Sequence, residues 1–137
     1  MLETISGIVA AVVIILLTRG LSKYFTTKLF AATILVAIAF IYVGFSLKNN
    51  PVSFIIVEIG FALVLYFLAI IGYTRNTLLL AYGIILHGIW DIFHHNGFLI
   101  GTDVPYYWPS FCFVIDIIDG LYFLIIFKKE KSIKPVL

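Results

Sequence analysis

The sequence predicts an all-α integral membrane protein, a bundle of five transmembrane helices. Hydrophobic residues make up 63% of its 137 residues, charged residues only 12%, and the mean hydropathy is +1.15. A soluble domain is about half apolar and about a quarter charged. A chain this short has a large surface for its volume, so it could not hide such an excess of apolar side chains from water. The composition therefore excludes a soluble globular domain, and it also excludes a disordered chain.

Three apolar runs in the N-terminal half predict membrane-spanning helices, each of which needs about 20 mostly apolar residues. Each run is followed by a polar stop that contains Lys, Arg or Asn, and the expected helices are 4–18, 29–47 and 52–73. The first run has no positively charged n-region and no small-residue cleavage site. We therefore expect it to be a retained helix rather than a signal peptide.

Two further apolar runs complete the bundle, with expected helices at 77–94 and 109–127. Asn96 and Gly97 supply a C-terminal cap for the first of these helices, and the basic run 128–131 ends the second. In lipid each run must form a helix, because only helices and closed barrels satisfy their own backbone hydrogen bonds. No repeat, linker or low-complexity tract interrupts the sequence, so we expect residues 1–137 to form a single domain.

The basic residues predict how the bundle is oriented. With five helices, the loops after the first and third lie on the same side as the C-terminal tail. This side carries eight of the nine Lys and Arg residues: Arg19, Lys23, Lys28, Arg75, Lys128, Lys129, Lys131 and Lys134. The positive-inside rule makes that side cytoplasmic, so we expect the N-terminus outside and the loop 95–108 facing outward. A net charge of +2 without a basic stripe gives no reason to expect a nucleic-acid partner.

Carboxylates occur inside the expected helices, where an ionisable group is costly and marks a functional or a paired position. They are four of the seven carboxylates of the chain: Glu58, Asp91, Asp116 and Asp119. At a rise of about 1.5 Å per residue, Glu58, Asp91 and Asp116 lie roughly 7 to 14 Å below the outer surface. His87 shares this depth, and Tyr42 reaches a similar one. We therefore expect one polar layer in the outer half of the membrane.

Two helical faces carry most of these polar groups. All three histidines lie with an aspartate within an arc of roughly 100° on the helix 77–94: His87, Asp91, His94 and His95. The helix 109–127 has a similar face with i, i+4 and i+3 spacing: Cys112, Asp116 and Asp119. Because a loop of ordinary length joins the two helices, we expect the two faces to meet.

The two faces predict a metal site. Imidazole nitrogen and carboxylate oxygen together suit a divalent transition metal, and zinc is the expected one. The predicted ligands, with His95 as a further one, are His87, Asp91, His94 and Asp116. Three protein ligands and a water make the open arrangement of catalytic zinc sites, with Glu58 or Asp119 as the catalytic base. Cys112 is expected to be a small buried hydrophobe. Alternatively, the His and Asp side chains form a structural hydrogen-bond network between helices.

The string His-x2-Trp-Asp-x2-His-His at 87–95 resembles the signature of a family of small, uncharacterised multi-pass membrane proteins of bacteria and fungi. In that family the string is followed by a Pro-rich outer loop and a Ser/Cys-x3-Asp segment. Here these correspond to 104–110 and to Cys112 with Asp116. The resemblance covers 83–119 and implies a membrane location with a shared polar site, but no activity. The expected location is the bacterial inner (plasma) membrane, with the site toward the outer face.

Three functions are compatible with this pattern. The first is metal-assisted hydrolysis, or another modification, of a lipophilic substrate that reaches the site from the lipid bilayer. The second is a proton- or cation-coupled transporter or channel subunit, although the sequence shows no inverted repeat. The third is an accessory subunit of a membrane complex. Five helices make a thin bundle, so we expect a homo-oligomer or a membrane partner in each case.

Overall fold

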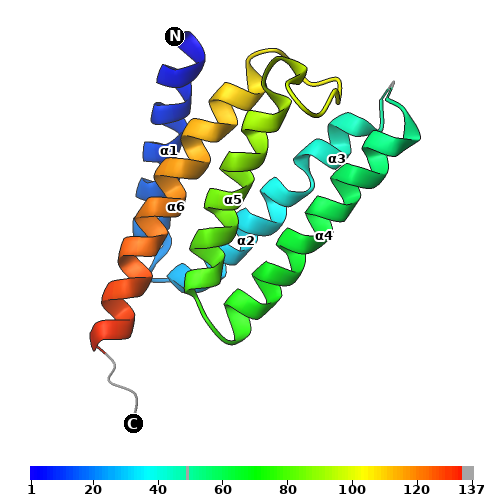
Figure 1. The fold of residues 1–137 in the computed structure, drawn as a ribbon. Helices are drawn as coiled ribbons and strands as arrows, with labels where there is room; N and C mark the ends of the chain where they lie inside the picture. Colours follow the sequence, from blue (N-terminus) through cyan, green and yellow to red (C-terminus); the bar gives the residue numbers. More distant parts are fainter. Residues whose placement is uncertain (49, 134–137) are drawn as a thin grey trace.

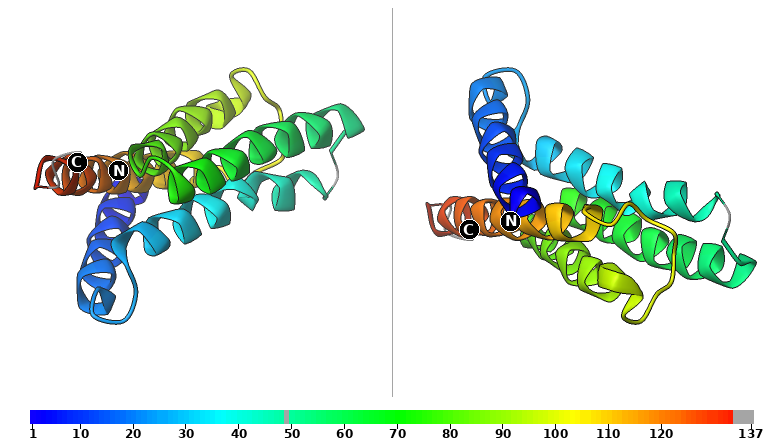
Figure 2. Two further views of the ribbon diagram at one scale, coloured as in Figure 1. Left: turned by 90° about the horizontal axis from the view of Figure 1, so that it is seen from below. Right: turned by 90° about the horizontal axis from the view of Figure 1, so that it is seen from above.

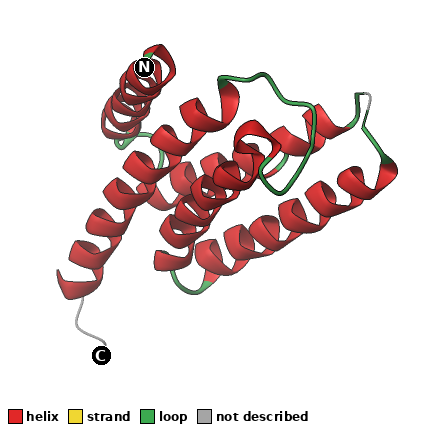
Figure 3. Cartoon of the chain, turned by 45° about the horizontal axis from the view of Figure 1, so that its top comes forward, coloured by secondary structure: helices red, strands yellow, loops and turns green. Residues whose placement is uncertain are grey.

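The computed structural model describes residues 1–48 and 50–133, and in this part of the chain every regular element is a helix and there are no strands (Figure 1). Loops join the helices, and the one between η1 and α6 is longer than the others (Figure 3). In chain order the elements are α1 (Leu2–Leu21), α2 (Thr27–Ala39), α3 (Ile41–Ser46), α4 (Val52–Thr74), α5 (Leu78–His94), the 3-10 turn η1 (His95–Gly97) and α6 (Trp108–Ile133). Lys134, one of the cations expected at the cytoplasmic side, lies outside the described residues.

The lengths of the helices are those of a membrane protein. Four stretches are long and apolar enough to span a bilayer: Leu2–Leu21, Thr27–Ser46, Val52–Thr74 and Trp108–Ile133. The fifth apolar helix, α5, has 17 residues, or about 25 Å, slightly less than the roughly 30 Å of a hydrocarbon core. The all-helical prediction is confirmed, and full-length spans are present for four of the five expected helices.

The boundaries differ from the predicted ones in two respects. The helices α1 and α6 extend beyond the predicted 4–18 and 109–127 because helical hydrogen bonding continues where side chains turn polar. The predicted helix 29–47 is corrected to two helices, α2 and α3, which are separated at Phe40 (φ −99°, ψ 0°). The break accompanies the burial of Tyr42, whose hydroxyl donates a hydrogen bond to Asp91 on α5.

The helix α5 lies at the centre of the bundle, where it packs against α2, α4 and α6. The helix α1 lies to one side and packs mainly on α6 (Figure 2). Close approach there depends on Gly7, since a Cβ at this position would lie 2.8 Å from the backbone oxygen of Phe111. Small residues of this kind let helices associate within a bilayer, where hydrophobic burial offers little driving force.

Most of the buried polar side chains lie in one half of the bundle. The half next to η1 contains Glu58, His87, Asp91, His94, Thr102, Asp116 and Asp119, whereas buried Thr18 lies near the other end of α1. The other half is filled by apolar side chains that include Leu35, Leu65, Leu80, Phe123 and Phe127. The N-terminus lies at the polar half, and α6 ends beyond the apolar half (Figure 1). The sequence pattern thus correctly predicts a polar layer near one end of the bundle.

Candidate metal centre

The two polar helical faces that the sequence spacing predicts lie on α5 and α6. On α5, His87 and Asp91 are one turn apart, so both project from the same face. Gly88 allows the helices to approach closely, because a Cβ there would lie 3.2 Å from the Asp116 Cβ. The expected meeting of the two faces is therefore present in the structure.

Four buried side chains could hold one metal ion. They are His87, Asp91, Cys112 and Asp116, and each offers one ligand atom within 4.8 Å of the others. His87 Nδ1 lies 2.6 Å from Asp116 Oδ2 and 3.9 Å from Asp91 Oδ1. Tyr42 donates a hydrogen bond of 2.6 Å to Asp91 Oδ1, which orients this carboxylate. We call these four side chains the four-residue group.

Two atoms of the four-residue group lack a hydrogen-bond partner among the described residues. These atoms are His87 Nε2 and Asp91 Oδ2, and both residues have 0% of their surface exposed. A buried polar atom without a partner costs about 1–3 kcal/mol. A metal ion would satisfy such atoms, and imidazole, carboxylate and thiolate are all established zinc ligands. The donor chemistry therefore fits a transition metal.

His94 lies outside the four-residue group, in a second cluster around Glu58. Its Nδ1 donates to the Trp90 carbonyl at 3.1 Å, and its Nε2 lies 2.6 Å from Glu58 Oε1. Thr102 and the Trp90 indole also donate to Glu58, at 2.6 and 3.2 Å. Both ring nitrogens of His94 are thus engaged. Tyr42 connects the two clusters, because its ring stacks on His94 with centroids 4.0 Å apart.

The other two expected site residues lie apart from the four-residue group. His95 is exposed, and its Nδ1 lies 3.3 Å from the Ser110 hydroxyl. Asp119 is fully buried, and neither of its carboxylate oxygens has a partner in the described part of the chain. Glu58, the alternative base, is held by hydrogen bonds with His94, Thr102 and Trp90 and does not belong to the group.

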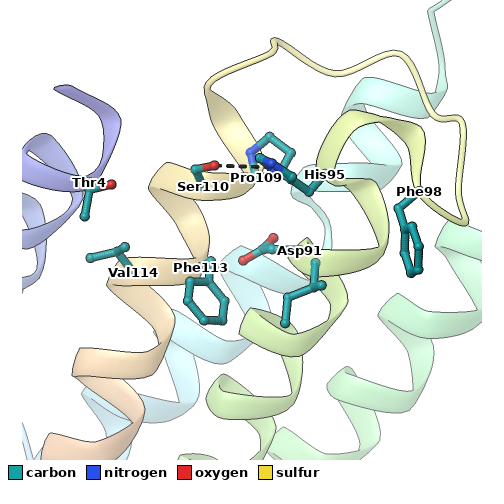
Figure 4. Close-up of a pocket in the computed structure, with 9 residues that line it drawn as sticks. Thr4, Asp91, His95, Phe98, Pro109, Ser110, Phe113 and Val114 are labelled. Carbon is teal, nitrogen blue, oxygen red and sulfur yellow. Dashed lines mark hydrogen bonds between the residues drawn. The ribbon is translucent and has the colours of Figure 1, made fainter. Parts of the chain in front are cut away.

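A cavity of about 710 Å³ lies between α1, α5 and α6, and Asp91 forms part of its wall. Figure 4 shows the Asp91 carboxylate between α5 and α6, with Ser110 and His95 nearer the end of the bundle. Phe113 and Phe98 are among the apolar lining residues. This volume is that of typical small-molecule sites, which are also mostly apolar with a few polar groups. The cavity gives the four-residue group contact with a space large enough for a ligand.

Sequence reasoning missed Cys112 as a potential ligand. The available signal was its i, i+4 spacing to Asp116, which places both on one face of α6. Thr102 was missed as well, because a loop threonine has no periodic pattern that would associate it with Glu58. Tyr42 was expected at the depth of the polar layer, and the structure adds its hydrogen bond to Asp91.

Comparison with known proteins gives one match. Residues 2–129 match the model of a protein family described as a family of unknown function (DUF6010). No curated protein and no solved structure matches the chain.

Proposed function

Because the chain belongs to a family of unknown function, DUF6010, we propose a function from the site itself: a metal-dependent membrane hydrolase acting on a lipophilic substrate. The observation that carries the proposal is the four-residue group, with four ligand atoms within 4.8 Å of one another. The two unpartnered atoms, His87 Nε2 and Asp91 Oδ2, support it. The proposed ligands are the members of the group, with Cys112 in place of His94.

Zinc is the proposed metal. Asp91, Asp116 and a metal-bound Cys112 thiolate would supply three negative charges, which more than offset a divalent cation in an interior where uncompensated charge is costly. His87 adds a nitrogen and Cys112 a sulfur, a mixture that zinc accepts and that magnesium or calcium does not favour. Ligand atoms around zinc lie at about 2.0–2.3 Å from the ion. A group spread over as much as 4.8 Å therefore contracts on binding, or one member stays outside the coordination shell.

The cavity beside Asp91 supports a lipophilic substrate. Its walls include Phe98, Phe113 and Val114, which suit an acyl chain, whereas Ser110 and His95 offer polar contacts for a headgroup. With three members of the four-residue group as ligands and the fourth outside the coordination shell, a bound zinc would keep an open position, polarise a substrate carbonyl and activate water for attack. Tyr42 would keep the Asp91 carboxylate oriented through its hydrogen bond. These roles describe hydrolysis of an ester or amide of a lipid-like molecule.

The arrangement favours an enzyme over a transporter. A transport route needs polar groups or water through the whole membrane. On the far side of Asp119, the core of the described chain is apolar and includes Leu80, Phe123 and Phe127. The polar layer is thus reached from one end of the bundle, as in an active site.

The proposal is tested by the metal content of detergent-purified protein, measured by elemental mass spectrometry. We expect close to one zinc per chain in the wild type and loss of most of it in His87→Ala and Asp91→Ala. His95→Ala is the matched control, because this exposed histidine lies outside the four-residue group and should leave the metal content unchanged. Absence of metal in the wild type, even after incubation with zinc and with iron, would overturn the proposal.

A further inference from the structure

A second cavity, of about 860 Å³, lies at the opposite end of the bundle from the metal centre. Here α2 and α5 begin and α4 and α6 end (Figure 1). The lining includes three cations that come from separate parts of the chain, Lys28, Arg75 and Lys131, and one acid, Glu130. These charges sum to +2, from three positive groups and one negative group.

The three cations of this cavity have no carboxylate within 4.0 Å in the described part of the chain. Lys28 contacts an aromatic face instead, with its Nζ 4.4 Å from the centre of the Tyr73 ring. Like charges that line one hollow repel each other, and the repulsion is relieved when an anion binds between them. The cavity is therefore electrostatically suited to an anionic ligand.

Hydrogen-bond donors in the same cavity add specificity. Thr26, Thr27 and Thr77 line it, close to the first turns of α2 and α5. The first-turn N–H groups of α5 are already engaged, because those of Leu78 and Leu79 donate to Asn76 and that of Leu80 donates to the Thr77 carbonyl. The donors for an anion are therefore the side chains of the lining. Because the carbonyl ends of α4 and α6 lie at the same end, the helix dipoles largely cancel, and the side-chain charges set the sign.

We propose that this cavity binds a phosphate group, carried by a lipid headgroup or by a soluble molecule. The planar guanidinium of Arg75 matches two phosphate oxygens at once, and Lys28 and Lys131 add point charges. The net charge of +2 suits a phosphate better than a single carboxylate. Basic pockets between helices at the cytoplasmic side of membrane proteins bind anionic headgroups, and the cation distribution predicts that this end is cytoplasmic. Ile133, an exposed residue of the lining, offers contact to the apolar part of a lipid.

The test measures binding of a short-chain phosphatidate to the purified protein by thermophoresis. Arg75→Gln/Lys131→Gln should weaken binding by about tenfold or more. The matched control is Lys23→Gln/Lys129→Gln, which removes the same charge from the same end without touching the cavity lining. We expect the control to stay within about twofold of the wild type. Arg75→Lys, which keeps the charge but loses the planar fork, should give an intermediate affinity.

The source of the phosphate is distinguished by a second ligand. If glycerol 3-phosphate competes with phosphatidate, the site recognises the phosphate group itself. If phosphatidate binds and glycerol 3-phosphate does not, the site recognises a lipid headgroup. Equal loss of binding in both double variants would overturn the proposal. It would show that binding depends on the overall positive charge of this end and not on the residues that line the cavity. Equal binding of a short-chain phosphatidylcholine, or no binding of either phosphate ligand by the wild type, would overturn it as well.

Discussion

The Tyr42 hydroxyl and the Asp91 carboxylate meet across 49 positions of sequence, with 2.6 Å between their oxygens. If Asp91 is a metal ligand, this hydrogen bond orients it from outside the coordination shell. Such outer contacts typically contribute 10–100-fold to metal affinity. Tyr42→Phe removes only the hydroxyl, so we expect a zinc affinity lower by about 10-fold or more, measured by competition with a chelating dye.

Tyr66→Phe is the control for this prediction, since Tyr66 is 39% exposed and lies away from the four-residue group. It should bind zinc as the wild type does. An unchanged affinity in Tyr42→Phe would show that the hydrogen bond to Asp91 serves packing rather than metal binding.

Helical spacing predicted only part of the residue-level arrangement. His87, Asp91 and Asp116 come together as expected, because spacing within a helix determines which side chains share a face. Whether His94 or Cys112 joins these three residues depends on how the helices are rotated against one another. It also depends on which hydrogen-bond partner a neighbouring helix offers. Glu58, on α4, engages His94 at 2.6 Å. No spacing within α5 could reveal that competition.

The pairing of α5 with α6 determines whether the four-residue group can form, because each helix contributes two of its members. Gly120 lies at this contact, where an added Cβ would be 2.5 Å from Ile85 Cγ1 and 3.2 Å from Ile85 N. Gly120→Ala should therefore lower the free energy of unfolding by about 1–2 kcal/mol, although alanine is the better helix former. Thermal unfolding in detergent measures this, with metal content as a second readout.

Gly60→Ala provides the comparison, because no atom lies within 4 Å of the position that its Cβ would take. Alanine there should leave stability unchanged or raise it by up to about 1 kcal/mol. Equal stability of the two variants would mean that the helices can separate at Gly120 without cost, which would contradict the tight α5–α6 contact.

Hydropathy predicted the helices better than it predicted their continuity. Every expected apolar run is helical, because a backbone in lipid has no other way to satisfy its hydrogen bonds. The break at Phe40 was not foreseen, since no proline occurs in 27–46 to mark it. The break accompanies the contacts that Tyr42 makes with Asp91 and His94 on α5. Contacts of this kind between helices leave no pattern in the sequence around Phe40.

At the scale of the whole molecule, three zones follow one another along the bundle. The polar layer with its cavity lies at the end of the N-terminus and η1, the apolar core lies next, and the basic end follows. The sequence predicted the polar layer and the basic end on opposite sides, because residue counts along a helix translate into depth. If the basic end is cytoplasmic, a substrate reaches the metal centre from the outer leaflet, and a phosphate ligand binds from the opposite side.

The orientation of the bundle can be measured by cysteine labelling in intact cells. Tyr106→Cys places a thiol in the loop before α6, where the native side chain is 76% exposed, and Lys128→Cys places one at the basic end. The native Cys112 is buried, so the wild type serves as the blank. The positive-inside rule predicts that a membrane-impermeant maleimide labels Tyr106→Cys in intact cells and Lys128→Cys only after lysis. The reverse pattern would place the metal centre toward the cytoplasm, and a substrate from the outer leaflet would then be excluded.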